Sequence, residues 1–538
     1  MFIDTRQMAE GAIVESTVCI IGGGVAGITI ALEFEKQGID CILLESGGKE
    51  ADDATRDLYR GENVGLPYDF ADGCRSRFLG GSSNCWGGWC RPFEDIDFRQ
   101  REWVANSGWP FGQEEVTPYY ARTHELLQLG PVNYDPAFWE AAVNRADVRR
   151  LPFTKQKVYD VISQFSPPAR FGKLYQARLS NAQHVDVYLY ANVIDIQSDA
   201  NGQTIQSVQV KTLTGRSISV RAKQFVLATG GIENARLLLA SNKIQANGIG
   251  NDNDVVGRYF MDHPRVYWGK ITPKDRNYRN KLFDHKFHYL NKAVSAHNTY
   301  IAGNFRLASS VQEQERILNT QVWFSSIFPA DGSAAMYALV HFKQAMHAME
   351  QPGVNLWRDF LTLLRHPIDT TTFVATRFLQ PPGWVKYMKL MAIGESDPNA
   401  DSRITLSSQR DALGMPRVKV DWRLSELVKR TFDRNFSLIA DELEAQGIWN
   451  VEREAPLEGR DWPADMEKGT WHHMGTTRMH DSPKLGVVDR NCQVHGMSNF
   501  YIAGSSVFPT GGCNYPTMMI TALALRLSGH IGKQVKKS

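Results

Sequence analysis

An α/β fold is predicted by three features of the chain. Residues 17–46 run as an apolar strand, a glycine turn, a helical pattern and a second apolar strand. A strand, a glycine turn and a helix return at 224–241, after segments 185–197 and 207–214, which alternate apolar and polar residues as antiparallel strands do. Helical patterns cover residues 110–129 and, as a clearly amphipathic helix, residues 426–447. We therefore expect parallel strands joined by helices, with an added antiparallel part.

The first strand–helix–strand unit has the glycine spacing of a dinucleotide site. After the strand at 18–21, Gly22 allows a tight turn and Gly24 a close approach to a pyrophosphate. Gly27 allows the helix to pack closely on the strand, and the phosphates would lie at the helix N-terminus. Glu45, which follows the second strand, can accept from ribose hydroxyls and would repel a 2′-phosphate. These residues alone fit FAD and NAD equally.

The composition is that of an ordinary globular enzyme. The 538 residues are 43% hydrophobic, and 60 basic residues nearly balance 58 acidic ones, so nucleic acid is not an expected partner. There is no apolar run long enough for a transmembrane segment, and the first fifteen residues lack the apolar core of a signal peptide. Seven scattered cysteines fit a reducing compartment, and Cys85 and Cys90 lack the further ligands of a zinc site. We therefore expect a cytoplasmic enzyme without a metal site.

Two other segments have the composition of pocket walls. Residues 78–92 hold four glycines, two serines and two tryptophans, which suits a backbone packed against a flat ligand, although a tight structural loop is the plainer alternative. Residues 264–394 are rich in aromatic side chains, among them Trp323, Trp357 and Phe378. Such a segment can wall a cavity while most of its rings serve as core.

The order of these segments resembles the glucose-methanol-choline (GMC) family of flavin oxidoreductases. The likeness covers nearly the whole chain and rests on the glycine turn with Glu45, the loop at 80–83, the segments at 227–230 and 256–264, and the stretches at 471–479 and 512–517. The resemblance implies FAD rather than NAD, bound by a Rossmann-like domain assembled from residues 1–110, 180–263 and 470–538. It also implies a substrate domain from residues 111–179 and 264–469, with an antiparallel sheet covered by helices.

By the same resemblance, one set of residues should line the FAD. This set is Gly22, Gly24, Val25, Ala26, Gly27, Glu45, Gly81, Ser82, Asn84, Cys85, Trp86, Gly87, Val193, Ala228, Gly504 and Ser505.

Within the family, the spacing from His472 to Gly475 looks closest to the pyranose-oxidase-like and bacterial sugar-dehydrogenase branch. Two departures stand out. Cys85 precedes Trp86 where pyranose oxidases carry a histidine linked to the flavin, so we expect non-covalent FAD. Asn514, Tyr515 and Pro516 stand where the common pattern is Asn-Pro, so the loop can be shifted by one residue.

Oxidation of an alcohol needs a base for the hydroxyl proton and an acceptor for the hydride. Flavin N5 can take the hydride, and histidine is the side chain best suited as the base. Spacing favours His472 as the base and puts His473 in a variable position. Asn514 is expected to orient the alcohol oxygen, although it can equally cap the apolar helix that follows.

The sequence therefore predicts an FAD-dependent enzyme that oxidises a hydroxyl group of a sugar, glycoside or related polyol. A dehydrogenase is favoured over an oxidase by the resemblance. A non-sugar alcohol, aliphatic or aromatic, and a lyase with structural flavin stay open as alternatives. A quinone, a redox protein and oxygen all stay open as electron acceptor, as does the oligomeric state.

Overall fold

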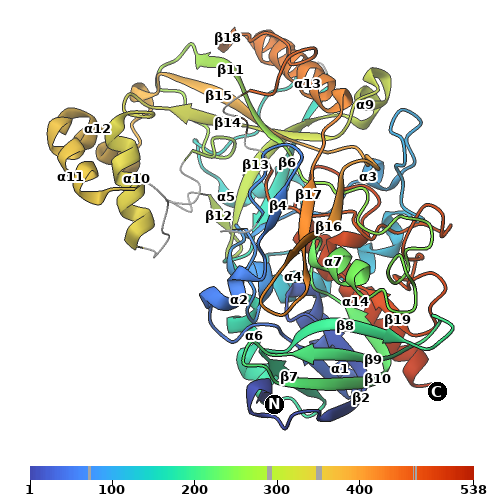
Figure 1. Cartoon of the computed structure of the whole chain (residues 1–538). Coiled ribbons are helices and arrows are strands. Elements are labelled where there is room, and N and C mark those ends of the chain that lie inside the picture. Colours follow the sequence, from blue (N-terminus) through green and yellow to red (C-terminus); the bar gives the residue numbers. More distant parts are fainter. Residues whose placement is uncertain are drawn as a thin grey trace.

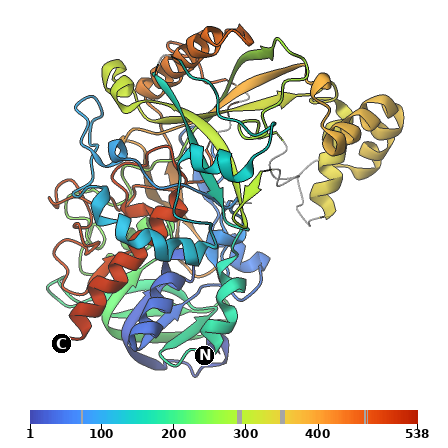
Figure 2. The same cartoon turned by 180° about the vertical axis from the view of Figure 1, so that it is seen from behind.

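A mixed sheet, an antiparallel sheet and a lobe of three helices make up most of the molecule (Figure 1). The computed structural model describes the chain apart from residues 71–73, 155, 287–293, 347–353, 464–465, 467–468 and 538. Seen from opposite sides, the mixed sheet and both chain ends lie at one pole (Figures 1 and 2). The antiparallel sheet lies at the other pole, and the helical lobe projects sideways from it.

The mixed sheet has a parallel core and an antiparallel extension. Its strands are ordered β1-β7-β3-β2-β10-β9-β8, and β19 pairs with the second half of β10. All neighbours from β1 to β10, and β19, are parallel, whereas β9 and β8 are antiparallel additions. The bounds are β1 Phe2–Asp4, β7 Val185–Leu189, β3 Cys41–Leu44, β2 Ile13–Ile21, β10 Ser217–Leu227, β9 Ile205–Lys211, β8 Asn192–Ser198 and β19 Phe500–Ile502.

Helices cover the parallel core. The apolar residues of α1 (Val25–Gln37) and of α14 (Pro516–Val535) are mostly buried, and the two helices pack against each other. This cover explains why β3 is apolar at all four of its positions, since a parallel strand between helices is buried on both faces.

Two expectations from the sequence were wrong in detail. Residues 185–197 were expected to form one antiparallel strand, but a turn at Tyr190, with φ of 58°, divides them into β7 and β8. Residues 110–129 were expected to form one helix, but only α4 (Tyr120–Leu127) is α-helical, after two short 3-10 turns. Pro118 lies in the second of these turns and has no N–H to donate, which favours a start of the α-helix beyond it.

The antiparallel sheet follows the order β18-β11-β15-β14-β13-β6-β5, with β12 paired to β13. Helix α13 (Glu426–Ala445) packs on it through buried apolar residues, and the rings of Phe436 and Trp268 stack with centroids 5.2 Å apart. The bounds are β18 Trp449–Glu452, β11 Arg265–Pro273, β15 Tyr387–Gly394, β14 Thr320–Ile327, β13 Thr299–Leu307, β6 Val158–Phe165, β5 Trp89–Cys90 and β12 Ser295–Ala296.

The remaining elements connect or cover these sheets. A small sheet pairs β16 (Arg403–Arg410), β17 (Pro416–Asp421) and β4 (Gly61–Asn63), and the lobe contains α10 (Ala334–Met346), α11 (Leu356–Arg365) and α12 (Pro367–Leu379). The other helices are α2 Asp53–Asp57, α3 Asp95–Phe98, α5 Pro136–Val143, α6 Phe171–Ser180, α7 Glu233–Ala240 and α9 Ser309–Glu315. Among the described residues, no helix has both the length and the apolar character needed to cross a membrane.

Candidate active site

One cavity of about 980 Å³ lies along the carboxyl ends of the parallel strands. Gly22 follows β2, Glu45 follows β3, Ala228 follows β10 and Gly504 lies two residues after β19, and all four residues line the cavity. Ligands of open α/β sheets bind at this edge, because parallel strands bring their ends and the following turns together. The far wall comes from the antiparallel sheet, through Trp89, Arg265, Trp323 and Met391.

The glycine turn fits a bound pyrophosphate. Gly22 has φ of 112°, and a Cβ there would come within 2.5 Å of the Ala228 carbonyl oxygen. A Cβ on Gly27 would meet the Gly22 oxygen at 1.9 Å, so this position must be glycine for the helix to lie against the turn. A Cβ on Gly24 would meet nothing nearer than Gly81 Cα, at 4.0 Å. The backbone at Gly24, at the N-terminus of α1, therefore faces open space of the kind a phosphate needs.

Glu45 is held at the end of β3 by backbone donors. The Gly47 N–H donates to its Oε1 at 2.8 Å and the Gly23 N–H to its Oε2 at 3.1 Å. Burial raises the pKa of Glu45, and the nearby Arg77 opposes this rise. The carboxyl group lies on the cavity wall, and its role toward the ribose hydroxyl groups stays a prediction.

Most of the residues expected around the cofactor line this one cavity. Two do not: Gly27 packs beneath the turn, and the Asn84 amide donates to the Leu79 carbonyl at 3.1 Å. Those on the wall are Gly22, Gly24, Val25, Ala26, Glu45, Gly81, Ser82, Cys85, Trp86, Gly87, Val193, Ala228, Gly504 and Ser505. Desolvation raises the pKa of the Cys85 thiol, so the structure does not mark it as a reactive thiolate.

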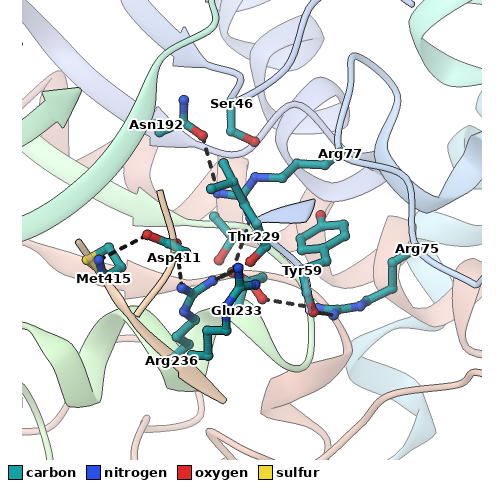
Figure 3. Close-up of polar contacts among 12 residues, drawn as sticks. Ser46, Tyr59, Arg75, Arg77, Asn192, Thr229, Glu233, Arg236, Asp411 and Met415 are labelled. Carbon is teal, nitrogen blue, oxygen red and sulfur yellow. Dashed lines mark hydrogen bonds and ion pairs between the residues drawn. The ribbon is translucent and has the colours of Figure 1, made fainter. Parts of the chain in front are cut away.

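A charged cluster that the sequence did not reveal lines another part of the cavity (Figure 3). Arg75, Arg77 and Arg236 each place Nη1 3.0–3.2 Å from the Glu233 carboxylate. Arg236 also pairs with Asp411 at 2.7 Å. Although burial acts in the opposite direction, the three guanidinium groups lower the pKa of Glu233 to about 2. No local motif could indicate this cluster, because its members come from three distant segments.

The buried carboxylate of Asp262 organises the turn that carries the candidate base. Its Oδ1 accepts from the backbone N–H of His472 at 2.9 Å and from the N–H and hydroxyl of Thr470, each at 3.2 Å. Its Oδ2 accepts from the Trp471 N–H at 2.9 Å and from the Tyr68 hydroxyl. Trp471 has φ of 62°, so this turn has a left-handed residue at its centre that the carboxylate stabilises.

The His472 ring is anchored through one nitrogen. Its Nδ1 lies 2.8 Å from Thr470 Oγ1 and 2.9 Å from Nδ1 of His263. If the Thr470 hydroxyl donates to Asp262, its oxygen can accept from His472 Nδ1–H, and in that tautomer Nε2 carries the lone pair. Burial, together with His263, lowers the pKa of His472 to about 3. His472 therefore lies on the cavity wall as a neutral ring.

His473 also reaches the cavity but lies in a different environment. Its ring packs against Tyr68 and Phe260, with centroids 5.9 and 6.0 Å away, and is 8% exposed. Burial lowers the pKa of His473 to about 4. Its Nε2 is buried without a hydrogen-bond partner among the described residues, in contrast to the anchored Nδ1 of His472.

Asn514, expected to orient the alcohol oxygen, does not line the cavity. Its side chain is fully buried and its amide donates to the Pro92 carbonyl at 2.6 Å. The next residue, Tyr515, lines the cavity instead, and its ring meets that of His472 edge to face at 5.7 Å. Pro516 is the first residue of α14, so Tyr515 stands directly before the helix and Asn514 one residue further back.

Aromatic rings form the wall beside Tyr515. Trp89 contacts Tyr515 and His285, each with centroids 5.1 Å apart, and His285 stacks on Trp323 at 5.0 Å. Trp323, from the aromatic segment at 264–394, lines the cavity. Trp357 and Phe378, from the same aromatic segment, are instead exposed on the helical lobe. The fold and the site together define a dinucleotide-binding oxidoreductase with a basic imidazole in an aromatic chamber.

Comparison with known proteins gives the class. The FAD dependent oxidoreductase family matches residues 17–246, and the GMC oxidoreductase family, through its C-terminal domain, matches residues 398–524. The chain is 23% identical to 2-methyl-1,2-propanediol dehydrogenase of Mycolicibacterium austroafricanum, with 97% of this chain and 96% of that protein covered. It is 23% identical to paromamine 6′-oxidase of Streptomyces fradiae, with 95% and 90% covered. Among solved structures, a formate oxidase variant of Aspergillus oryzae RIB40 is 15% identical, with a TM-score of 0.52 and 98% and 100% covered.

The chain belongs to the GMC oxidoreductases and is an FAD-dependent enzyme. The family assignment and the α/β fold predicted from the sequence are confirmed.

Proposed function

We propose that this enzyme oxidises a hydroxyl group of a sugar, glycoside or related polyol to the carbonyl. The observation that carries the proposal is the His472 ring, whose Nδ1 is engaged by Thr470 and whose Nε2 is left for the substrate hydroxyl. Bound FAD supplies the acceptor for the hydride that leaves the alcohol carbon. Paromamine 6′-oxidase is named for an amino sugar, and fructose dehydrogenase of Gluconobacter japonicus, 24% identical over 69% of this chain and 58% of that protein, for a sugar.

His472 would take the hydroxyl proton, and Tyr515 would contact the same substrate from the side. A base that is neutral before the reaction can accept a proton as the hydride departs, and the buried Asp262 below the turn stabilises the imidazolium formed. The aromatic wall at Trp89 and Trp323 excludes water and offers flat faces to a ring-shaped substrate.

The two-domain division remains part of this proposal. Strands of the mixed sheet come from residues 2–227 and 500–502, which supports an FAD-binding domain built from separated segments. Most antiparallel strands lie in the proposed substrate segments, 111–179 and 264–469, but β5 at 89–90 joins them from the first segment.

An anaerobic panel of sugars, glycosides and simple alcohols, scored by bleaching of the flavin absorbance, tests this function. Bleaching by sugars or glycosides is expected. The aromatic wall favours one second candidate, an aromatic alcohol, and bleaching by aromatic alcohols alone would select it. If no alcohol bleaches the flavin, the proposed reaction is wrong, and a lyase with structural flavin becomes the better reading.

We also propose a dehydrogenase rather than an oxidase, with a quinone or dye preferred to oxygen. The support is the resemblance to sugar dehydrogenases, whereas the names of the relatives include both activities. Turnover with oxygen as fast as with a dye acceptor would contradict this part of the proposal.

A further inference from the structure

The three-helix lobe exposes an unusual share of large apolar side chains. Helices α11 and α12 and the turn after them include Trp357 at 69% exposure, Ile368 at 79%, Phe378 at 82% and Trp384 at 47%. Other exposed apolar residues of these helices are Leu356, Phe360, Leu364, Val374 and Leu379. Single exposed apolar residues are ordinary on proteins, but a concentration of this size marks an interaction surface.

The apolar residues of α11 form one face that points away from the protein. Leu356, Phe360 and Leu364 are spaced by four, so they lie along one side of the helix, and the Trp357 ring stacks on Phe360 with centroids 5.7 Å apart. No residue of α11 is buried. An amphipathic helix on a globular protein normally turns this face to the core, so here the face lacks its apolar neighbour.

Helix α12 continues the surface after a single connecting residue, His366. Val374 and Phe378 are one turn apart, and Leu379 lies three turns after Ile368 on the same side. In both views α10, α11 and α12 stand clear of the two sheets, so the apolar surface is at a protruding end of the molecule (Figures 1 and 2).

The charges on the lobe have one sign. In the described part of residues 334–386, every exposed ionised side chain is a cation, namely Lys343, Arg358, Arg365 and Lys386. The two carboxylates are less exposed. Asp359 Oδ2 lies 3.0 Å from Nδ1 of His341, and Asp369 is partly buried. The whole chain, by contrast, is nearly balanced in charge.

We propose that this lobe docks the enzyme on the surface of an anionic lipid bilayer. Tryptophan and phenylalanine at the tip would enter the headgroup region, and the four cations would face the lipid phosphates. The lobe presents apolar side chains and cations together. An anionic bilayer supplies both an apolar layer and negative charge, and it can adapt to the shape of the lobe, whereas a protein partner would need carboxylates at matching positions. The helices would lie on the membrane without crossing it, in agreement with their length and amphipathic character.

Flotation of the full-length holoenzyme with vesicles tests the proposal. We expect recovery with vesicles that mix phosphatidylcholine and phosphatidylglycerol, much less with phosphatidylcholine alone, and a decline as salt is added. The double variant Trp357→Ser/Phe378→Ser should lose most of the binding, and Arg358→Gln/Arg365→Gln should bind more weakly and with less dependence on salt.

A control variant distinguishes binding through the lobe from non-specific binding through other exposed apolar residues. Val132 and Ile244 are 51% and 54% exposed but lie outside the lobe, so Val132→Ser/Ile244→Ser should float like the wild type. All variants should keep their bound flavin and its reduction by substrate, because none of these side chains lines the cavity.

Two results would overturn the proposal. One is failure of the wild-type holoenzyme to float with anionic vesicles at low salt. The other is a concentration-dependent dimer that Trp357→Ser/Phe378→Ser abolishes while vesicle binding is absent, which would make the lobe an interface between copies of this chain.

Discussion

The Nδ1 atoms of His263 and His472 lie 2.9 Å apart, although 209 residues separate them in the chain. Only one of the two rings can donate in this contact. If the Thr470 hydroxyl donates to the Asp262 carboxylate, the proton in this contact belongs to His472, and its Nε2 is the atom left to accept. The chemistry proposed for the site therefore depends on a short chain of hydrogen bonds behind the catalytic ring.

Replacing His472 by alanine should slow flavin reduction by roughly 10²–10⁴-fold, the usual contribution of a positioned base. Flavin content should survive, because the glycine turn and Glu45, the residues proposed to hold the cofactor, are unchanged. Anaerobic stopped-flow measurement of flavin bleaching gives the rate.

The control for this experiment is His473→Gln, which should reduce at close to the wild-type rate. A larger loss in His473→Gln than in His472→Ala would show that the neighbouring histidine is the base.

Replacing Thr470 by valine should slow flavin reduction on the order of tenfold, the worth of about one hydrogen bond. Valine keeps the shape of the side chain but removes the oxygen that fixes the His472 tautomer. Thr470→Ser retains the hydroxyl and should restore the rate. Equal rates in the valine and serine variants would mean that this hydrogen bond does not position the base.

The adjacent residues Asn514 and Tyr515 should separate stability from catalysis. Asn514→Ala leaves the Pro92 carbonyl without its donor and should lower the free energy of unfolding by about 1–3 kcal/mol, with little effect on flavin reduction. Tyr515 is buried and its ring packs on Trp89 and His472, so Tyr515→Ala should also lower stability but, unlike Asn514→Ala, should change substrate KM and the reduction rate. Thermal melting together with reduction kinetics measures both. The sequence-based assignment of Asn514 would be restored if Asn514→Ala were stable but slow to reduce.

Stability should fall as pH is lowered from about 6.5 to 4. His473 has a pKa of about 4 in the fold and 6.5 as its ordinary value, so between these values the unfolded chain takes up a proton that the folded chain does not. The loss from this group is about 1.4 kcal/mol per pH unit in that interval. His473→Gln should flatten the dependence of Tm on pH, and parallel curves for variant and wild type would argue against burial of this neutral ring.

The flavin should leave the protein on denaturation by acid or heat. Cys85 lines the cavity, but its raised pKa keeps the thiol protonated and poorly nucleophilic. Ultrafiltration of the denatured protein should place the yellow chromophore in the filtrate. Colour retained by the protein on a denaturing gel, and lost in Cys85→Ser, would instead show a cysteinyl link.

The sequence predicted the parts of the site that are local in the chain. The spacing of Gly22, Gly24 and Gly27 is set by one turn, and its role is readable because the flanking strand and helix are strongly patterned. Helix α13 and the end of strand β10 could be predicted for the same reason. His472 was chosen by spacing alone, and the contacts that would support that choice became visible only with the fold.

What the sequence could not predict depends on contacts across the chain. Arg75 meets Glu233, and Arg236 meets Asp411, through packing that no short motif encodes. Asn514 lies outside the cavity wall because its amide is held by the distant Pro92 carbonyl, and its role toward the substrate stays a prediction. Thr470 and Asp262 could have been singled out from the sequence, since both belong to or adjoin segments of the family pattern. Their hydrogen bonds to the turn and ring of His472 were not predicted.

The pairing of β19 with β10 determines when the cavity wall can be completed during synthesis. Strand β19, at residues 500–502, closes the cavity edge beside β10 and carries Gly504 and Ser505 into the wall. During synthesis, residues 1–227 leave the ribosome hundreds of residues before β19 exists, so the glycine turn is made long before the wall opposite it. The cavity wall is therefore complete only late in synthesis, and until then the edge of the half-formed sheet is open to pairing with other strands.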